Sequence, residues 1–302
     1  MGHALSAAAA AVLLLSSAPA MGATAQTELF DSAATAAANG WVLKNGEVGW
    51  GWQNSNFAGG LPGEARVTSF TAGIQRWYAD TDLGGTLTFT EDWYASGRMD
   101  FNENSASDGG MFFGFFNRDT SLASGTQTIA GFLLVNGQLR LRFERRPNTA
   151  DVETTDLGLW VNTDHTFRLA YDADGGGPGI GRLTATVTSL VGSSTTTRSL
   201  DINHALVAGA TLNSFGFYAM DFAPGRYTPV GWAVDGLKYG PGLGNDLKSL
   251  TLSSSMVAGC KTAVGTITLP SAAPASGAVV TLSDTLAAAS VPGRSEYGKT
   301  CR

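Results

Sequence analysis

The sequence predicts an all-β protein in which two antiparallel sheets stack as a jelly-roll sandwich, followed by a short C-terminal β segment. Three observations support this fold class. Short extended runs alternate with turn signals, a helical period is almost absent, and the 302 residues include 39 glycines. About thirteen such runs lie between residues 27 and 239. Without helices to cover a single sheet, this many strands must form two sheets that pack on each other.

The expected strands follow one another as short apolar or alternating segments. They are residues 28–30, 41–44, 65–71, 86–90, 97–101, 111–117, 129–135, 139–144, 166–172, 183–189, 195–201, 214–220 and 231–239. Residues 139–143 (LRLRF) place apolar side chains on one face and arginines on the other. Residues 111–116 (MFFGFF) are apolar throughout and indicate a strand buried on both faces. One short helix is expected at 32–39, because its alanine run ends at Asn39-Gly40.

Two connections are typical of hairpins. Asn136-Gly137 separates two apolar runs by two residues, which is the signal of a type I′ turn. Residues 172–181 (DADGGGPGIG) form a longer glycine-rich connection between two strands.

The first 25 residues are expected to be a secretory signal. An apolar stretch from Ala4 to Ala20 is followed by small-residue cleavage patterns that end at Ala20 and Ala25. No Lys or Arg precedes the stretch, so an uncleaved membrane anchor remains the alternative. No later run of 18 apolar residues exists, and we expect no membrane span after signal removal. The protein is therefore predicted to be secreted or at the cell surface.

The composition changes after the main domain, which is expected to span 26–240. Residues 241–247 are predicted to be a linker, and 248–302 form a second, shorter β module. Alternation is lost after Pro292, so we expect this module to be truncated. Cys260 and Cys301 are the only cysteines; with no histidine cluster beside them they indicate no metal site, and a disulfide between them stays open.

Charge and composition exclude two classes of protein. The net charge is −6, the pI is about 5.0, and no basic run occurs, which argues against nucleic-acid binding. Charged residues make up 15% and hydrophobic residues 43%, which excludes a disordered, highly charged chain.

Several segments resemble bacterial concanavalin A-like lectin/glucanase domains, the laminin-G-like jelly rolls of secreted multi-module proteins. The segments that carry the resemblance are 56–65 (NFAGGLPGEA), 78–89 (YADTDLGGTLTF), 95–97 (ASG), 108–110 (DGG), 172–181 and 232–237 (WAVDGL). The resemblance covers residues 27–240 and rests on turns and strand edges, so it implies a fold rather than an activity. Residues 262–266 and 279–282 are similar to the Ig-like modules of bacterial surface proteins, which implies that other modules of a longer chain accompany this domain.

No catalytic motif is recognisable. Glucanases of this superfold carry acidic residues that alternate along one strand, whereas Glu91-Asp92 are adjacent and Asp80-x-Asp82 lacks a third member. A Ser-His-Asp triad has few candidates beyond His165 and His204, which are expected to be solvated. The chain is therefore predicted not to be an enzyme.

Carbohydrate binding uses aromatic faces together with amides and carboxylates that match sugar hydroxyls. The candidate ligand-binding residues are Trp52, Asn54, Trp77 and Asp108. The alternative is that the tryptophans fill the core, since tryptophan is usually mostly buried.

No cofactor is required by any motif, and calcium is the one metal for which candidate ligands exist. Asp172-x-Asp174-Gly175 offers two carboxylates and free carbonyls, the hard oxygen ligands that calcium prefers. The segment lacks the Glu and the flanking helices of an EF-hand, so an ordinary Asp/Gly turn is the alternative.

The sequence thus predicts a non-catalytic extracellular domain of a larger protein that binds carbohydrate or a cell-surface glycan, or mediates adhesion. A glycoside hydrolase or polysaccharide lyase of the same superfold is the first alternative. A structural spacer without a ligand is the second.

Overall fold

The computed structural model describes residues 25–45, 49–71, 76–102, 110–120, 127–135, 138–145, 152–153, 156–157, 163–219, 227–242, 249–252 and 265–268. The chain divides into two compact units, Met1–Gly244 and Asn245–Arg302. Each unit is described by itself.

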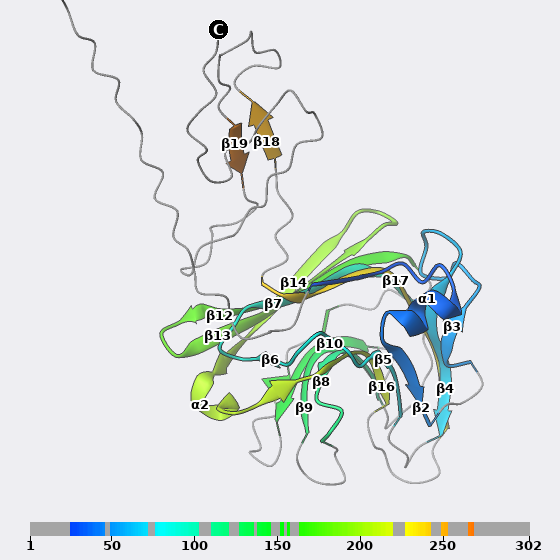
Figure 1. The fold of residues 1–302 in the computed structure, drawn as a ribbon, viewed down its shortest axis with the longest axis horizontal. Coiled ribbons are helices and arrows are strands. Elements are labelled where there is room, and N and C mark those ends of the chain that lie inside the picture. Colours follow the sequence, from blue (N-terminus) through cyan, green and yellow to red (C-terminus); the bar gives the residue numbers. More distant parts are fainter. Residues whose placement is uncertain are drawn as a thin grey trace, which may run out of the picture. The chain divides into compact units, whose positions relative to one another are not determined.

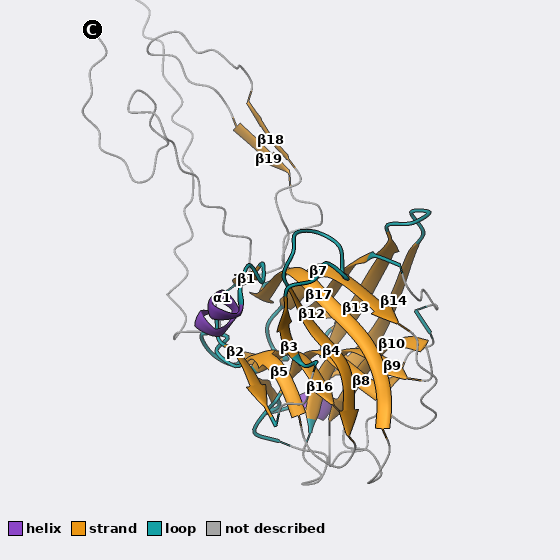
Figure 2. Ribbon diagram, turned by 90° about the vertical axis from the view of Figure 1, so that its right-hand side faces the viewer, coloured by secondary structure: helices purple, strands orange, loops and turns teal. Residues whose placement is uncertain are grey.

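The first unit contains two antiparallel sheets, which lie one over the other in Figures 1 and 2. The eight-stranded sheet comprises β1 (Gln26–Glu28), β3 (Gly51–Gln53), β4 (Glu64–Thr71), β7 (Trp93–Asn102), β12 (His165–Gly177), β13 (Ile180–Ser189), β14 (Thr195–Asn203) and β17 (Tyr227–Pro241). The seven-stranded sheet comprises β2 (Trp41–Lys44), β5 (Arg76–Asp80), β8 (Gly110–Phe116), β9 (Thr128–Val135), β10 (Gln138–Arg145), β11 (Val152–Glu153) and β16 (Ser214–Ala219).

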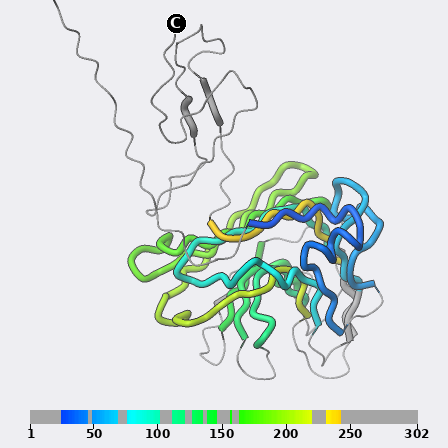
Figure 3. Tube along the Cα trace, viewed as in Figure 1, coloured from blue at the N-terminus to red at the C-terminus, as the bar shows by residue number. Residues whose placement is uncertain are grey.

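Strands far apart in sequence are neighbours in both sheets. The strand orders are β14-β13-β12-β7-β17-β4-β3, with β1 beside β17, and β11-β10-β9-β8-β16-β5-β2. Figure 3 shows the N-terminal segment (blue) running along β17 (yellow), its pairing partner. The predicted all-β, two-sheet antiparallel jelly-roll sandwich is confirmed.

Short elements complete the described residues. Helix α1 (Ala33–Ala38) begins at Ser32, whose Oγ accepts a hydrogen bond from Thr35 N (3.0 Å), and ends at Asn39, so the predicted helix is confirmed. Helix α2 (His204–Val207) and the pair β6 (Leu87–Thr88) and β15 (Thr211–Leu212) join the sheets. None of the described helices has the length and apolar character needed to cross a bilayer.

In the second unit, β18 (Ser249–Leu252) pairs antiparallel with β19 (Gly265–Thr268), which matches the short C-terminal β segment of the predicted fold class. The predicted signal at 1–25 falls almost entirely outside the described residues, as do most of the linker at 241–247, both cysteines and the end of the module. These domain assignments and the Ig-like character of 248–302 remain predictions.

The sequence missed β5, a strand inside the seven-stranded sheet. Residues 76–80 are absent from the expected strands, but they pair with β16 on one side and β2 on the other. All five residues are buried. Burial on both faces removes the alternation by which a strand is recognised, and the charged Arg76 and Asp80 at its ends leave no apolar run like that of 111–116.

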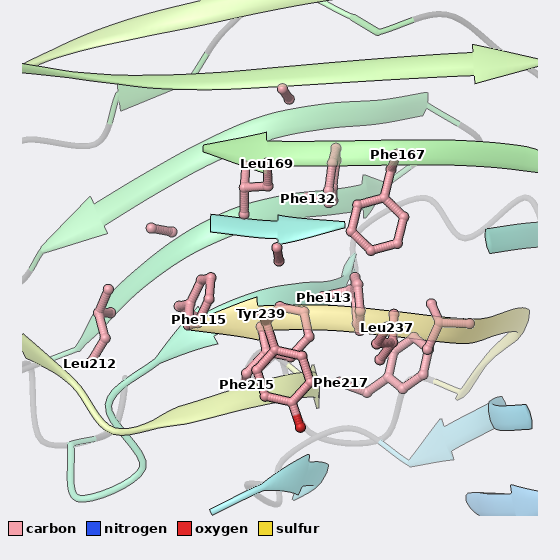
Figure 4. Packing of buried hydrophobic residues seen from close by; sticks show 14 of the residues in the cluster. Phe113, Phe115, Phe132, Phe167, Leu169, Leu212, Phe215, Phe217, Leu237 and Tyr239 are labelled. Atoms are coloured by element: carbon pink, nitrogen blue, oxygen red, sulfur yellow. The ribbon is translucent and has the colours of Figure 1, made fainter. Parts of the chain in front are cut away.

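The core lies between the two sheets and is largely aromatic. Phe113 of the seven-stranded sheet contacts Phe215, Phe217 and Trp232 of β17, and Phe217 also contacts Trp232, with ring centroids 4.9–5.9 Å apart. Figure 4 shows these phenylalanines facing Phe167 and Leu169. The residues 111–116 are buried on both sides of β8, as the sequence predicted.

A buried hydrogen-bond chain crosses this apolar core. Tyr239 of β17 donates from its hydroxyl to Asp80 Oδ2 (2.8 Å), and Trp41 Nε1 donates to the same hydroxyl (3.1 Å). The second oxygen of Asp80 accepts from Asp82 N (2.7 Å). Figure 4 shows the Tyr239 ring beside Phe215, on which it stacks at 4.3 Å. Tyr239 therefore links the eight-stranded sheet to two strands of the seven-stranded sheet.

We expect Tyr239→Phe to lower the free energy of unfolding by about 1–3 kcal/mol, because Asp80 loses a donor and the indole of Trp41 loses its acceptor inside the core. Chemical denaturation of the purified variant measures this loss. Tyr94→Phe, at a half-buried tyrosine of the same sheet, is the matched control. An equally small effect of both changes would contradict the linking role of Tyr239.

Candidate functional site

The seven-stranded sheet carries a second apolar cluster on its outer face, the face turned away from the eight-stranded sheet. Phe112, Tyr218 and Trp77 form one cross-strand row on β8, β16 and β5. Phe116 contacts Tyr218 (centroids 5.1 Å apart) and Trp77 (6.1 Å). All four side chains are at most 5% exposed. At the sheet edge, Lys44 Nζ lies 4.1 Å from the Trp77 ring centroid in a cation–π contact.

A row of glycines lies beside these aromatic residues. Gly131, Gly114 and Gly216 are direct cross-strand partners on β9, β8 and β16. A Cβ at Gly114 would lie 3.0 Å from Cζ of Phe112, and one at Gly131 would lie 2.9 Å from the same atom. The Phe112 ring therefore occupies the space that side chains would fill at these positions. Only glycine permits this packing.

A buried ion pair lies next to the glycine row, on β10. Arg142 Nη2 lies 2.6 Å and its Nε 3.2 Å from Glu144 Oε2. The two residues are spaced by two, so both point to the outer face, opposite Gly131 and Ile129. Glu144 is fully buried and Arg142 is 9% exposed. The alternation in 139–143 predicted the side of Arg142, but not its burial or its partner.

Gln127 adds an unpaired amide at the start of β9. Its side chain is fully buried, and neither Nε2 nor Oε1 has a hydrogen-bond partner. No sequence signal singled out this residue, because it stands alone before an apolar strand. Together with Arg142 and Glu144 it adds polar groups to the outer face, beside a surface of aromatic rings.

The predicted ligand-binding residues do not form one platform. Trp77 lies on the outer face just described. Trp52 lies on β3 of the other sheet, packs partly buried against the central core, and donates from Nε1 to Phe30 O (2.6 Å). Asn54 is exposed just after β3, and Asp108 lies outside the described residues. Ligand binding by this set remains a prediction.

The predicted calcium ligands lie at the end of β12. Asp172 Oδ1 accepts a hydrogen bond from Asp174 N (3.0 Å), and Asp92 Oδ1 accepts one from Ala173 N (2.8 Å). Burial, with the charges of Asp172 and Asp174, raises the pKa of Asp92 above its ordinary value. In the described part of the chain, no three His, Cys, Asp or Glu side chains are placed to hold a metal ion. The calcium site remains a prediction.

A second polar cluster lies on the outer face of the eight-stranded sheet, beneath the loop between β3 and β4. Gly59 and Gly60 have φ values of 76° and 103°, and a Cβ would lie 2.8 Å from Asp164 Oδ2 and 2.6 Å from Asp235 Oδ2, respectively. The loop backbone thus rests directly on the carboxylates. Burial raises the pKa of Asp235 to about 6.

Asp100 belongs to the same cluster and is 6% exposed. Burial, together with the charges of Asp164 and Glu64, raises its pKa to about 6. The neighbouring His165 was expected to be solvated, which is wrong: it is fully buried and stacks on Phe101 with centroids 5.6 Å apart. Its burial lowers the pKa of its imidazole.

Comparisons with known proteins find similarity to solved structures at low sequence identity. No family model matches the chain, and no curated protein matches its sequence. Among solved structures, a protein of unknown function from Shewanella oneidensis MR-1 is 10% identical, with 76% of this chain and 90% of that chain covered and a TM-score of 0.49.

Two further similar structures are an alginate lyase and a lectin. The marine PL-14 alginate lyase from Aplysia kurodai is 12% identical, with 74% of this chain and 100% of that chain covered and a TM-score of 0.49. Lectin II from Ulex europaeus is 11% identical, with 61% and 89% covered and a TM-score of 0.41. These values are too low to transfer a ligand or a reaction to this chain.

The ion pair predicts a distinctive mutational pattern. Arg142→Met leaves the Glu144 carboxylate buried without this partner and should cost about 3–5 kcal/mol of stability. Arg142→Met combined with Glu144→Met should cost far less, because no buried charge is left behind. Urea denaturation of the single and double variants measures both effects. Additive losses would contradict direct coupling between the two side chains.

The acidic cluster predicts that stability rises on mild acidification. The pKa values of Asp100 and Asp235 are raised in the folded chain, so folding stabilises their protonated forms. This contribution is fully present below the unfolded pKa near 4 and is lost as the pH rises through about 6. We expect Tm to be higher at about pH 5 than at about pH 7.5. Asp100→Asn should flatten this dependence, whereas Asp201→Asn, at an exposed site, should leave it unchanged.

Proposed function

We propose that the chain binds carbohydrate without cleaving it, and that the outer face of the seven-stranded sheet is the binding face. The observation that carries the proposal is the meeting of aromatic rings and charged side chains on that face, where the exposed Lys44 lies over the Trp77 ring and Arg142 pairs with Glu144. Sugars present C–H surfaces that pack on aromatic rings and hydroxyls that both donate and accept hydrogen bonds. An adhesive role would use the same face to bind surface glycans.

Location outside the cell is part of this proposal. It rests on the expected signal within residues 1–25, and the small number of cysteines does not contradict it. The second unit would then connect this domain to further modules of a longer secreted or surface protein.

Cleavage of a polysaccharide is the second candidate, and one observation favours it. Asp100 and Asp235 have pKa values raised to about 6, which suits a general acid near neutral pH. Against this role, the backbone at Gly60 rests on Asp235, where a sugar would have to bind. A structural spacer is the third candidate and predicts no binding at all.

A glycan array probed with the purified full chain, with calcium and again with EDTA, tests the proposal. We expect binding to a defined set of glycans, without release of reducing ends or unsaturated sugars from the bound polysaccharides. Loss of binding in EDTA would direct attention to Asp172 and Asp174. Product release would favour the enzyme, and no binding by the folded chain would favour the spacer.

Lys44→Ala locates the binding face, because Lys44 is exposed and lies over the Trp77 ring at its edge. Loss of one charge-assisted hydrogen bond to a sugar should weaken binding about tenfold. The matched control is Lys238→Ala, an exposed lysine on the other sheet. If Lys238→Ala weakened binding and Lys44→Ala did not, the binding face would lie on the eight-stranded sheet instead.

A further inference from the structure

Residues 59–62, in the loop between β3 and β4, form a short strap over the outer face of the eight-stranded sheet. Hydrogen bonds hold the strap in place at both ends. Ala58 N donates to Glu64 Oε2 (2.8 Å) before the strap, and Gly63 N donates to Ser55 O (2.9 Å) after it. The strap therefore crosses the sheet face between two fixed points.

The backbone of the strap can rotate at little cost. Gly59, Gly60 and Gly63 have φ values of 76°, 103° and 117°, which glycine adopts without strain. Gly60, Leu61 and Pro62 are exposed, and Leu61 is 70% exposed. Segments with few buried apolar contacts are those that open locally at the lowest free energy. The strap can therefore lift while the two sheets stay intact.

The carboxyl group of Asp235, on β17, lies beneath the strap. A Cβ at Gly60 would lie 2.6 Å from Asp235 Oδ2, so the strap backbone closes directly over this oxygen. The other carboxyl oxygen accepts a hydrogen bond from Gly236 N (2.6 Å). Asp235 is 5% exposed although it points to the outer face of the sheet. The strap thus contributes to shielding this carboxyl group from water.

The charged side chains around Asp235 are mostly acidic, and the strap itself carries no charge. Among the described residues they are Glu64 and Arg66 on β4, Arg98 and Asp100 on β7, Asp164 before β12, Asp31 after β1, and Lys238 beyond the bulge of β17. Burial, together with the charge of Glu64, raises the pKa of Asp235 to about 6, and Arg98 offsets this rise only in part. An ionised Asp235 would be enclosed among like charges.

We propose that the strap is a pH-dependent cover, closed over Asp235 when its carboxyl group is protonated and lifted when the group is ionised. This inference goes beyond the proposed function and does not depend on it. A neutral carboxyl group can stay under the strap, whereas burial of a carboxylate is costly and favours the entry of water. Asp235 itself cannot move out, because β17 pairs with β4 on one side and β7 on the other. Water therefore enters when the strap lifts.

Proton linkage sets the direction and the size of the effect. The pKa of Asp235 is about 6 under the closed strap and returns to its ordinary value near 4 once the carboxyl group is solvated. The stabilisation of the closed state is fully present below about pH 4 and is lost as the pH rises through about 6. Between about pH 5 and about pH 7.5, the ratio of closed to lifted chains should fall about tenfold.

Gly60→Ala tests whether the strap is what raises the pKa of Asp235, because the added Cβ collides with Asp235 Oδ2 and prevents closure. In a carbon NMR titration of the carboxyl group in the full chain, the pKa should fall from about 6 to about 4. Gly177→Ala is the matched control: its φ of 106° is close to that of Gly60, but its Cβ would meet nothing within 4 Å. It should leave the pKa unchanged. A pKa near 6 in a folded Gly60→Ala variant would overturn the proposal.

Asp235→Asn tests whether ionisation lifts the strap, and it does not require the glycine variant to fold. Asparagine has the same shape and stays neutral, so the strap should stay closed at every pH. Hydrogen exchange at Ala58 N and Gly63 N reports lifting, because both hydrogen bonds adjoin the strap. The rate in the unaltered chain relative to the variant should rise up to about tenfold from about pH 5 to about pH 7.5.

The comparison is made at equal pH, and the substitution is remote in sequence from the two amides, so their intrinsic exchange rates cancel. Asp201→Asn, at an exposed carboxylate of β14, is the control and should exchange like the unaltered chain at both pH values. A rate ratio for Asp235→Asn that does not change with pH would show that the strap responds to no charge on Asp235, and would overturn the proposal.

Discussion

The hydrogen bond from Tyr239 to Asp80 is the polar contact on which the arrangement of the two sheets depends. Apolar packing favours contact between the sheets, but it fixes their relative position only loosely, because one aromatic contact can replace another. A buried hydrogen bond has no such freedom, since an unpaired group in the core is costly. The chain from Trp41 through Tyr239 to Asp80 therefore selects one alignment of β17 over β5 and β2. The positions of the side chains on the outer face of the seven-stranded sheet depend on this alignment, because they lie on the same strands.

Burial of the seven-stranded sheet on both faces explains how polar groups come to be enclosed there. One face of the sheet contributes to the central core, and the other carries its own aromatic cluster. In such an environment the ion pair between Arg142 and Glu144 offsets part of the cost of burying two charges, and the amide of Gln127 is buried without a hydrogen-bond partner. These groups would be unremarkable at a solvated surface. Within an apolar face they are the polar groups on which the proposed carbohydrate-binding role rests.

The hydrophobic pattern of the sequence predicted those strands and helices that are determined by residues close together in the chain. The alternation of 139–144, the apolar run 111–116 and the alanine run after Ser32 all correspond to elements of the structure. The strand β5 escaped prediction because its five buried residues begin with Arg76 and end with Asp80, so that it shows neither alternation nor a continuous apolar run. Strand ends also extend beyond the predicted ranges, as in β12, which continues to Gly177 through residues that were expected to form a loop.

The candidate site was harder to predict than the fold. Trp52 and Trp77 have the same side chain, yet one donates to a backbone carbonyl beside the core and the other lies on the opposite side of the sandwich. Nothing in their sequence neighbourhoods distinguishes these positions, because the packing partners come from distant strands. Arg142 and Glu144 are two residues apart, which predicts that they lie on the same face of the sheet. The lack of hydrogen-bond partners for Gln127, in contrast, can be seen only in the folded chain.

The glycine row has a consequence for how this sequence can diverge. Gly114 pairs with Gly131 on one side and with Gly216 on the other, and a Cβ at Gly114 or Gly131 would meet the ring of Phe112. A side chain at any one of these glycines would collide with backbone atoms of the neighbouring strands. Substitution of a glycine is therefore tolerated only if the neighbouring aromatic residue and the spacing of the strands change together. Distant relatives that retain the same outer face are thus recognisable by three aligned glycines and one phenylalanine, even where overall identity has vanished.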